Sequence, residues 1–457
     1  MNDSNTHVPS KEPRIDRRSL LKLGAAGAAT ALVAGAPSAA QANSGRGSLG
    51  VVAHDDFPIE ISPDYKRFDH YHTVLNLAGR RGIPNMAPYY DNDKPGFAIP
   101  DYAMSLASAT VFYDYLNDGL NNIHEATDAL PEPYTFPSSA VAHAQIKRAA
   151  RLFGADLVGI TRRDERWDYS EVLHSEGRVR GETAKHQGGG VMIPGVRNRT
   201  LPWDEALPGF NPKTVIVIGC EMEYEALTTA PSQIADATAN HAYSGLTSIL
   251  MHMTKFLNNL GYKSVPSVNR LGLNIPYGVA AGLGELNRMG LLHNYKYGSR
   301  FRVARLYTEL ELDEYFDKPV TFGVQRFCEN CLHCADNCPS QAISHDDKPT
   351  IYTAEDVKDR PYMNPGVRKW YTDGQKCHDY WIESGTACGS CITTCPYNKP
   401  NFWHHRLIDR LNTFLPGRAH KFMADMDLLH GYGKVFDAKA PAVFWNPKGR
   451  SYDGLKG

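Results

Sequence analysis

The chain has few of the features that would assign it to a common class. Its 49 Lys and Arg are balanced by 50 Asp and Glu, so the formal net charge of −1 gives no long-range field that would attract nucleic acid or anionic lipid. After Asn43 it has no uninterrupted apolar run of about 18 residues, the length that indicates a membrane-spanning helix. We therefore expect no nucleic-acid partner, and a mature chain that is soluble or only peripherally attached to a membrane.

Cysteine is scarce except in one segment. Of 9 Cys, Cys220 stands alone at the end of an apolar run, where a buried and inert thiol is expected. The other eight lie between Cys328 and Cys395. Such crowding predicts metal centres or a set of disulfides, depending on the compartment.

The first residues bear on that compartment. Arg17 and Arg18 open a twin-arginine signature, a mildly apolar Ala/Gly-rich run follows, and Ala40-Gln41-Ala42 offers a cleavage site. We expect residues 1–42 to be a twin-arginine signal peptide; the alternative is a disordered basic leader. Because this route carries folded proteins, often with cofactors inserted, export here does not favour disulfides over metal clusters.

The full chain of 457 residues is long enough for two or three domains. Residues 43–137 predict an irregular unit with short helices, and 138–318 a regular unit that is α/β or α+β. Residues 319–400 form the cysteine-rich segment, and 401–457, with Trp403, His404 and His405, a segment that wraps back. Within the regular unit the expected helices cover 140–153, 234–260 and 276–291, the expected strands cover 156–161, 214–219 and 301–310, and 162–212 is an excursion over the surface.

Two cysteine motifs carry the chemistry. The first, Cys328-x2-Cys331-x2-Cys334-x3-Cys338-Pro, matches the run found in bacterial two-cluster ferredoxins. The second is a stretched version that starts at Cys377 and ends in -Cys-Pro. In such runs three thiolates of one loop bind one cube, and the fourth binds the other cluster.

The spacing therefore assigns two mixed ligand sets. Cluster one takes Cys328, Cys331, Cys334 and Cys395, and cluster two takes Cys338, Cys377, Cys388 and Cys391. Zinc or disulfides are the alternatives, but zinc sites do not need the Cys-Pro ending. Two adjacent clusters form a path for single electrons, so we expect a further redox centre in the residues that precede them.

Flavin, nicotinamide and corrinoid are the candidates for that centre. Gly282-Leu-Gly284 lacks the third glycine of a dinucleotide fingerprint. The chain also lacks the D-x-H-x-x-G run with which some corrinoid proteins provide a histidine to cobalt, so a bound corrinoid has no ligand of that type.

Four features of the sequence, taken together, resemble those of a known family. The chain resembles the catalytic subunit of respiratory reductive dehalogenases in four features taken together: the twin-arginine leader, the double cysteine motif, Trp403-His404-His405, and a central block. That block runs through Glu221-Met-Glu-Tyr, Ala242-Tyr243-Ser-Gly-Leu, Gly261-Tyr-Lys-Ser-Val-Pro, Ala281-Gly-Leu-Gly-Glu and Tyr297-Gly-Ser-Arg-Phe-Arg. The resemblance implies an α+β fold, with a nitroreductase-like corrinoid-binding domain followed by a ferredoxin-like domain holding two [4Fe–4S] clusters.

The resemblance also implies a reaction. Electrons pass through the clusters to a cobalamin-type corrinoid without a protein axial histidine, and halogen on an organic substrate is replaced by hydrogen. Tyr243 matches the proton donor and Arg302 its basic partner; a phenol is a poor acid, and a cation beside it stabilises the phenolate. Arg300 is the nearby alternative to Arg302. Asn269 matches a position near substrate and corrinoid, and Gly282 and Gly284 are expected to contact the corrinoid.

The same family implies partners and a location. These are a halogenated substrate, a small membrane-anchor subunit, and a quinol-linked or other membrane electron donor, on the outer face of the cytoplasmic membrane. Two other functions stay open: an epoxyqueuosine reductase-like enzyme with a tRNA substrate, and a plain electron-transfer ferredoxin. The leader and the near-neutral charge argue against the first, and the large central domain argues against the second.

Overall fold

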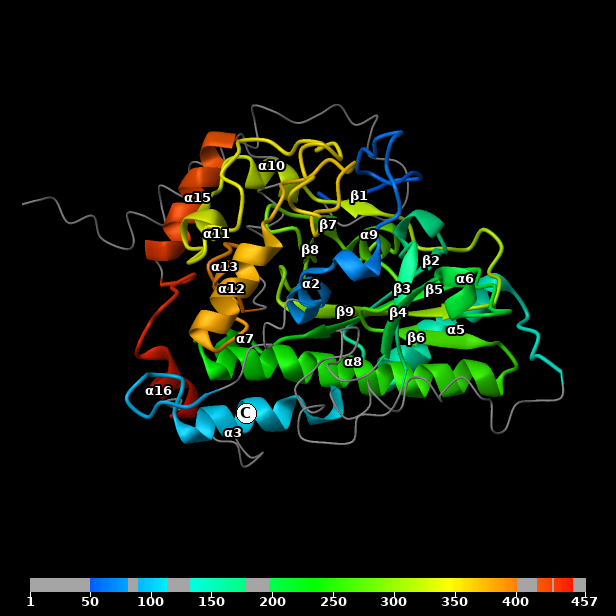
Figure 1. The fold of residues 1–457 in the computed structure, drawn as a ribbon, viewed down its shortest axis with the longest axis horizontal. Coiled ribbons are helices and arrows are strands. Elements are labelled where there is room, and N and C mark those ends of the chain that lie inside the picture. The colour runs from blue at the N-terminus through cyan, green and yellow to red at the C-terminus, as the bar shows by residue number, and fades with distance from the viewer. Residues whose placement is uncertain are drawn as a thin grey trace, which may run out of the picture. The chain divides into compact units, whose positions relative to one another are not determined.

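The computed structural model describes residues 50–80, 89–112, 132–176, 197–400, 417–429 and 431–446. All of them belong to one compact unit that spans Leu49–Gly457 (Figure 1). The predicted signal peptide and Trp403, His404 and His405 lie outside the described residues. In the part that is described, no helix has the length and apolarity required to cross a bilayer.

A four-stranded antiparallel sheet forms the centre of this unit. Its order is β2 (Leu157–Arg162), β5 (Thr214–Glu221), β9 (Phe301–Thr308) and β6 (Ser264–Ser267). The β-branched run of β5 is buried along almost its whole length, because β2 and β9 flank it and both of its faces are covered. All pairings are antiparallel, and this decides for α+β over α/β.

One face of the sheet is covered by the long helix α8 (Gln233–Asn259), with α5 (Ser139–Leu152) beside it (Figure 1). The Ser232 side chain caps the start of α8 by accepting a hydrogen bond from the amide of Ala235 at 3.1 Å. Gly261, with a φ of +87°, ends the helix as the sequence predicts. Apolar side chains of α8 pack against Ile216, Ile218 and Leu306 of the sheet.

The opposite face carries a second core. It contains α9 (Asn274–Ala280), η3 (Glu165–Trp167), α6 (Trp203–Ala206) and the hairpin of β3 (Glu171–Glu176) with β4 (Arg197–Pro202). The described part of the predicted 162–212 excursion therefore includes ordered strands.

The predicted helix over 276–291 is wrong beyond Ala280. Gly282 and Gly284 have φ values of +69° and +156°, which an α-helix does not accommodate. The chain then forms β7 (Glu285–Leu286), which pairs with β8 (Leu292–His293). The apolar spacing of this segment suits a helix, but the positive φ at both glycines ends α9 early.

The remaining elements surround the cysteines and the edges of the sheet. Short helices α10 (Val324–Cys328), α11 (His333–Asp336), α12 (Gly374–Ser384) and α13 (Ser390–Thr393) carry the motifs, and α15 (Gly417–Leu429) lies against α10. The N-terminal part contributes β1 (Val52–Ala53), which pairs with β10 (Val320–Thr321), and η2 (His70–His72), α2 (Val74–Arg80) and α3 (Ile99–Ser108). The chain also contains α7 (Tyr224–Leu227) and α16 (Ala440–Trp445).

Candidate iron–sulfur and proton-donor sites

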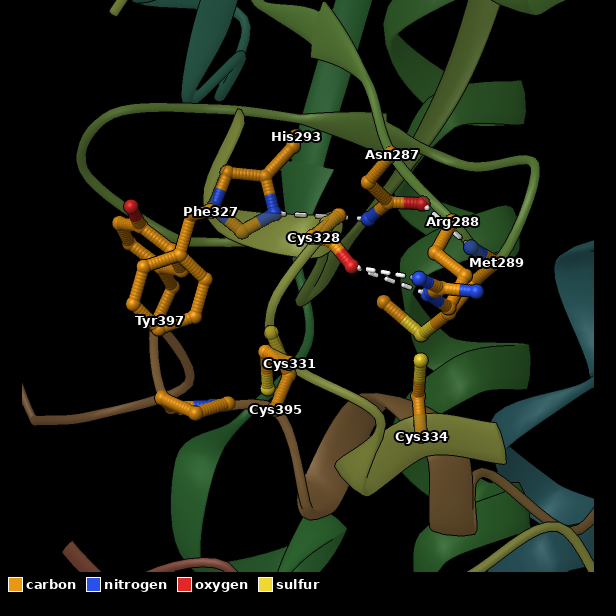
Figure 2. A pocket seen from close by; sticks show the side chains of 11 residues that line it. Asn287, Arg288, Met289, His293, Phe327, Cys328, Cys331, Cys334, Cys395 and Tyr397 are labelled. Atoms are coloured by element: carbon orange, nitrogen blue, oxygen red, sulfur yellow. Dashed lines mark hydrogen bonds between the residues drawn. The ribbon is translucent and has the colours of Figure 1, made fainter. Parts of the chain in front are cut away.

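The first four-cysteine group gathers around one pocket. Cys328 ends α10, Cys331 follows on the loop, Cys334 lies on α11, and Cys395 reaches the same pocket from the second motif (Figure 2). The other lining residues are Asn287, Arg288, Met289, His293, Phe327, Pro396 and Tyr397. The structure thus brings together the four cysteines that the spacing assigns to cluster one.

The members of the second four-cysteine group are identified by the effect of each thiolate charge on the pKa of its neighbours. Burial, followed by the charges of Cys388 and Cys338, raises the pKa of Cys377 to about 12. Burial, followed by the charges of Cys388, Cys377 and Cys338, raises the pKa of Cys391. Cys338 of the first motif therefore lies among the cysteines of the second, which is the set that the spacing assigns to cluster two.

A tight turn positions part of this second group. Cys388 itself has a φ of +61° and Gly389 a φ of +86°, so two successive residues are left-handed where α13 begins. The turn brings Cys388 and Cys391 close together. A residue with a side chain at position 389 would be strained in this left-handed conformation, which explains the glycine there.

Both groups suit iron–sulfur clusters. Burial raises the pKa of Cys328 to about 11 and that of Cys331 to about 12, so without a cation these thiols would stay protonated at neutral pH. Iron offsets the repulsion among four buried thiolates. A cube holds each thiolate on a separate iron, so its ligands need not converge; among the described residues no three His, Cys, Asp or Glu side chains are placed to hold a single ion.

Aromatic rings and a buried arginine surround the first pocket. The rings of Phe327 and Tyr397 meet edge-on with centroids 4.9 Å apart, and His420 of α15 lies 5.2 Å from Phe327. Arg288 is fully buried, and Trp370 packs against its guanidinium at 4.7 Å. The sequence gave no signal for Arg288.

Tyr243 and Arg302 meet in space although the sequence separates them. Tyr243 comes from α8 and Arg302 from the second position of β9, on the sheet face that α8 covers. The guanidinium carbon lies 5.3 Å from the centroid of the Tyr243 ring, and Phe112 stacks on that ring at 4.9 Å. The Nε atom of Arg302 is buried and has no hydrogen-bond partner. The pair thus retains a donor that can serve an anion or a polar ligand.

Asp236 connects this pair to the second cysteine group. Its carboxylate accepts hydrogen bonds from Ser105 at 2.7 Å, from Asn240 at 2.7 Å and from the amide of Ala387, next to Cys388, at 3.3 Å. Burial raises its pKa, while these hydrogen bonds and the charge of Arg302 act in the opposite direction. The sequence did not single out Asp236, because a lone Asp in a helix carries no chemical signature.

Arg300 has a different role from Arg302. It precedes β9, is 1% exposed, and forms an ion pair with Glu221. Its remaining donors bind the carbonyl of Met222 at 2.6 Å and the side-chain oxygen of Asn398 at 3.0 Å. Through these contacts Arg300 links the end of β5 to the end of the second cysteine motif.

The other predicted site residues, Asn269, Gly282 and Gly284, make contacts that do not involve Tyr243 or Arg302. The side-chain oxygen of Asn269 accepts a hydrogen bond from Asn274 at 2.9 Å, and Asn274 in turn binds Arg305. A Cβ at Gly282 would lie 2.4 Å from the carbonyl oxygen of Lys318, and one at Gly284 would lie 2.0 Å from that of His293. Close backbone contact therefore accounts for both glycines, and their predicted contact with a corrinoid stays a prediction.

Comparisons with known proteins agree with this geometry. Residues 327–398 match the family described as a 4Fe-4S double cluster binding domain. A tetrachloroethene reductive dehalogenase of Dehalobacter restrictus is 38% identical over an alignment of 339 residues, and the match covers 70% of this chain and 60% of that protein. The chain is similar to reductive dehalogenases. The resemblance expected from the sequence is thereby confirmed.

The fold agrees as well. A solved structure titled "Reductive dehalogenase structure suggests a mechanism for B12-dependent dehalogenation" matches with a TM-score of 0.59 at 22% identity, and the match covers 84% of this chain and 49% of that one. The predicted α+β fold with a two-cluster domain is confirmed. An epoxyqueuosine reductase of Lactococcus garvieae is 29% identical over 146 residues, only 32% of this chain. The chain spans about 60% of the length of the reductive dehalogenase from Dehalobacter restrictus.

Proposed function

We propose that this chain is a reductive dehalogenase that replaces halogen by hydrogen on an organic substrate. The observation that carries the proposal is the Tyr243–Arg302 pair, with its unpartnered buried Nε, in a chain that also gathers eight cysteines into two groups of four. When bound, the two [4Fe–4S] clusters supply electrons one at a time, and a corrinoid supplies the reducing centre for the carbon–halogen bond.

The cysteines divide the task of holding the clusters. Cys328, Cys331, Cys334 and Cys395 hold the first cluster, and Cys338, Cys377, Cys388 and Cys391 hold the second. Each group takes one ligand from the other motif, which ties the two loops together. Two clusters bound in this way would share one scaffold and would supply electrons one at a time.

Tyr243 supplies the proton. Its hydroxyl donates a proton to the carbon, which receives two electrons through the cofactors and releases halide, and the guanidinium of Arg302 stabilises the phenolate that remains. Phe112 stacks on the Tyr243 ring, and this packing helps to orient the hydroxyl. Asp236 links α8 to the loop that carries Cys388, and thereby fixes Tyr243 of the same helix relative to the second cysteine group.

A bound corrinoid would supply its cobalt as the reducing centre at the substrate; Asn269, Gly282 and Gly284 are the residues predicted to contact it, and no histidine is proposed as a ligand to cobalt. Arg302 supports a ligand site beside Tyr243, because its free Nε needs an acceptor that a bound substrate, halide or cofactor would provide. The proposed substrate class is halogenated organic compounds. One of the matched structures is described as a complex with 3-bromo-4-hydroxybenzoic acid, and curated relatives are named for tetrachloroethene.

The proposal extends to location and partners. The ordered leader around Arg17 and Arg18 supports export by the twin-arginine route, and hence action on the outer face of the cytoplasmic membrane. We also propose, from the family resemblance, that a small anchor subunit and a quinol-linked or other membrane donor complete the electron path.

The deciding experiment is an assay of the purified holoprotein with reduced viologen and a panel of chlorinated alkenes, chlorinated alkanes and halogenated phenols. Stoichiometric release of halide with formation of the hydrogen-substituted product is expected for at least one class. The matched control is Tyr262→Phe, which removes a hydroxyl bound to the carbonyl of Tyr134 outside the site. Turnover of an epoxyqueuosine-containing tRNA stem loop, with no halide released from any compound, would favour the alternative function.

A further inference from the structure

Arg288 is a buried cation that lines the first cluster pocket. It follows β7 and is 0% exposed. Its Nε and one terminal nitrogen donate to the carbonyl oxygen of Cys328 at 3.2 and 2.6 Å, as Figure 2 shows. The other terminal nitrogen donates to the carbonyl oxygens of Ser344 at 2.9 Å and Asp346 at 2.7 Å.

All of these acceptors are uncharged carbonyl oxygens. A buried arginine usually pairs with a carboxylate, as Arg300 does with Glu221. At Arg288 the hydrogen bonds go to neutral groups, and no carboxylate of the described residues forms an ion pair with the guanidinium. The indole ring of Trp370, held by its own hydrogen bond to the Asp346 carbonyl at 2.9 Å, covers the guanidinium face.

We propose that Arg288 tunes the reduction potential of the cluster held by Cys328, Cys331, Cys334 and Cys395, and raises it through its buried charge. This inference rests on the cluster binding proposed above. Reduction brings in one electron from the donor, breaks no bond and moves no proton, so the site becomes more negative by one charge. A fixed cation in a poorly screened interior stabilises that reduced state more than the oxidised one.

Glu285 is a buried carboxylate whose charge opposes that of Arg288 near Cys328. It is 6% exposed, accepts hydrogen bonds from the amides of Phe322 and Val324, and its charge acts on Cys328. It lies three residues before Arg288. Removing its carboxylate charge should shift the potential of the same cluster in the direction opposite to that caused by removing Arg288.

The experiment is a potentiometric titration of the full-length holoprotein, followed by the EPR signals of the two reduced clusters. The signal of the first cluster is identified as the one altered in Cys328→Ser. Arg288→Met removes the charge, Arg288→Lys keeps it with fewer hydrogen bonds, and Glu285→Gln removes the opposing charge. Arg326→Gln is the matched control, because it removes an exposed cation two residues before Cys328.

For Arg288→Met we expect the reduced-to-oxidised ratio of the first cluster, at the wild-type midpoint, to fall on the order of tenfold, equivalent to about 59 mV for one electron. Arg288→Lys should stay near wild type, Glu285→Gln should move the other way, and the second cluster and Arg326→Gln should change little. A first-cluster signal that dithionite no longer reduces, with iron content intact, counts as the same downward shift.

Two results separate the possible failures. If Arg288→Met retains iron and sulfide but leaves the first midpoint unchanged, or if Arg288→Lys shifts as far as Arg288→Met, the charge does not set the potential and the inference is overturned. If the wild-type protein itself holds no [4Fe–4S] clusters, the proposed function fails and this inference fails with it.

Discussion

The sharpest test of the proton-donor site removes one hydroxyl group. Tyr243→Phe keeps the ring that packs on Phe112 and faces Arg302, so both clusters and the corrinoid should still bind. Only the acid is lost. General acid catalysis contributes roughly 10²–10⁴-fold, and we expect the rate of halide release per holoenzyme to fall by that order.

The contribution of Arg302 follows from its distance. The guanidinium carbon lies 5.3 Å from the ring centroid, and a unit charge at about that distance contributes about 3 kcal/mol at an effective dielectric constant of about 20. Tyr243 and Arg302 are both partly exposed, so screening reduces this to roughly 1–3 kcal/mol. Arg302→Gln should therefore lower turnover roughly ten- to hundredfold, and Arg302→Lys should lose less.

A double-mutant cycle tests whether the two residues act as one unit. If Arg302 works by stabilising the Tyr243 phenolate, Arg302→Gln should cost little once Tyr243→Phe is present. The assay is viologen-driven halide release, normalised to iron and cobalt content, with Tyr262→Phe as the control. Equal activity of wild type and Tyr243→Phe at equal cofactor content would refute the proton-donor role. Fully additive losses would show that Arg302 acts independently of Tyr243.

The remaining predictions concern cofactors, export and the fold. The holoprotein should contain about eight iron and about eight acid-labile sulfides with one cobalt per chain, and iron near four, or zinc in its place, would contradict two clusters. The double substitution Arg17→Lys with Arg18→Lys should trap an unprocessed precursor in the cytoplasm, and normal processing would show that the leader is misread. Gly284→Ala should destabilise the protein by more than about 1 kcal/mol in thermal unfolding, because its Cβ would overlap the carbonyl of His293; an unchanged midpoint would disprove that contact.

The local pattern of the sequence was sufficient for much of the fold. The β-branched run of β5, the cap at Ser232 and the glycine at 261 set β5 and α8 close to their expected bounds. Such features work through contacts within a few residues, which is why they can be read along the chain. The same local pattern failed over 276–291, where the conformations of Gly282 and Gly284 depend on backbone contacts with distant strands.

The chemistry divides in the same way. The spacing of the cysteines alone determined two ligand sets, because the reach of a short loop fixes which thiolates can share a cube. The family resemblance singled out Tyr243 among the 24 tyrosines and preferred Arg302 to Arg300. Only the tertiary structure shows that the two side chains meet, since a ring on α8 reaches a guanidinium on β9 only after the helix packs on the sheet. Arg288 gave no sequence signal for the same reason: its significance lies in burial and in uncharged partners, and both are properties of the folded chain.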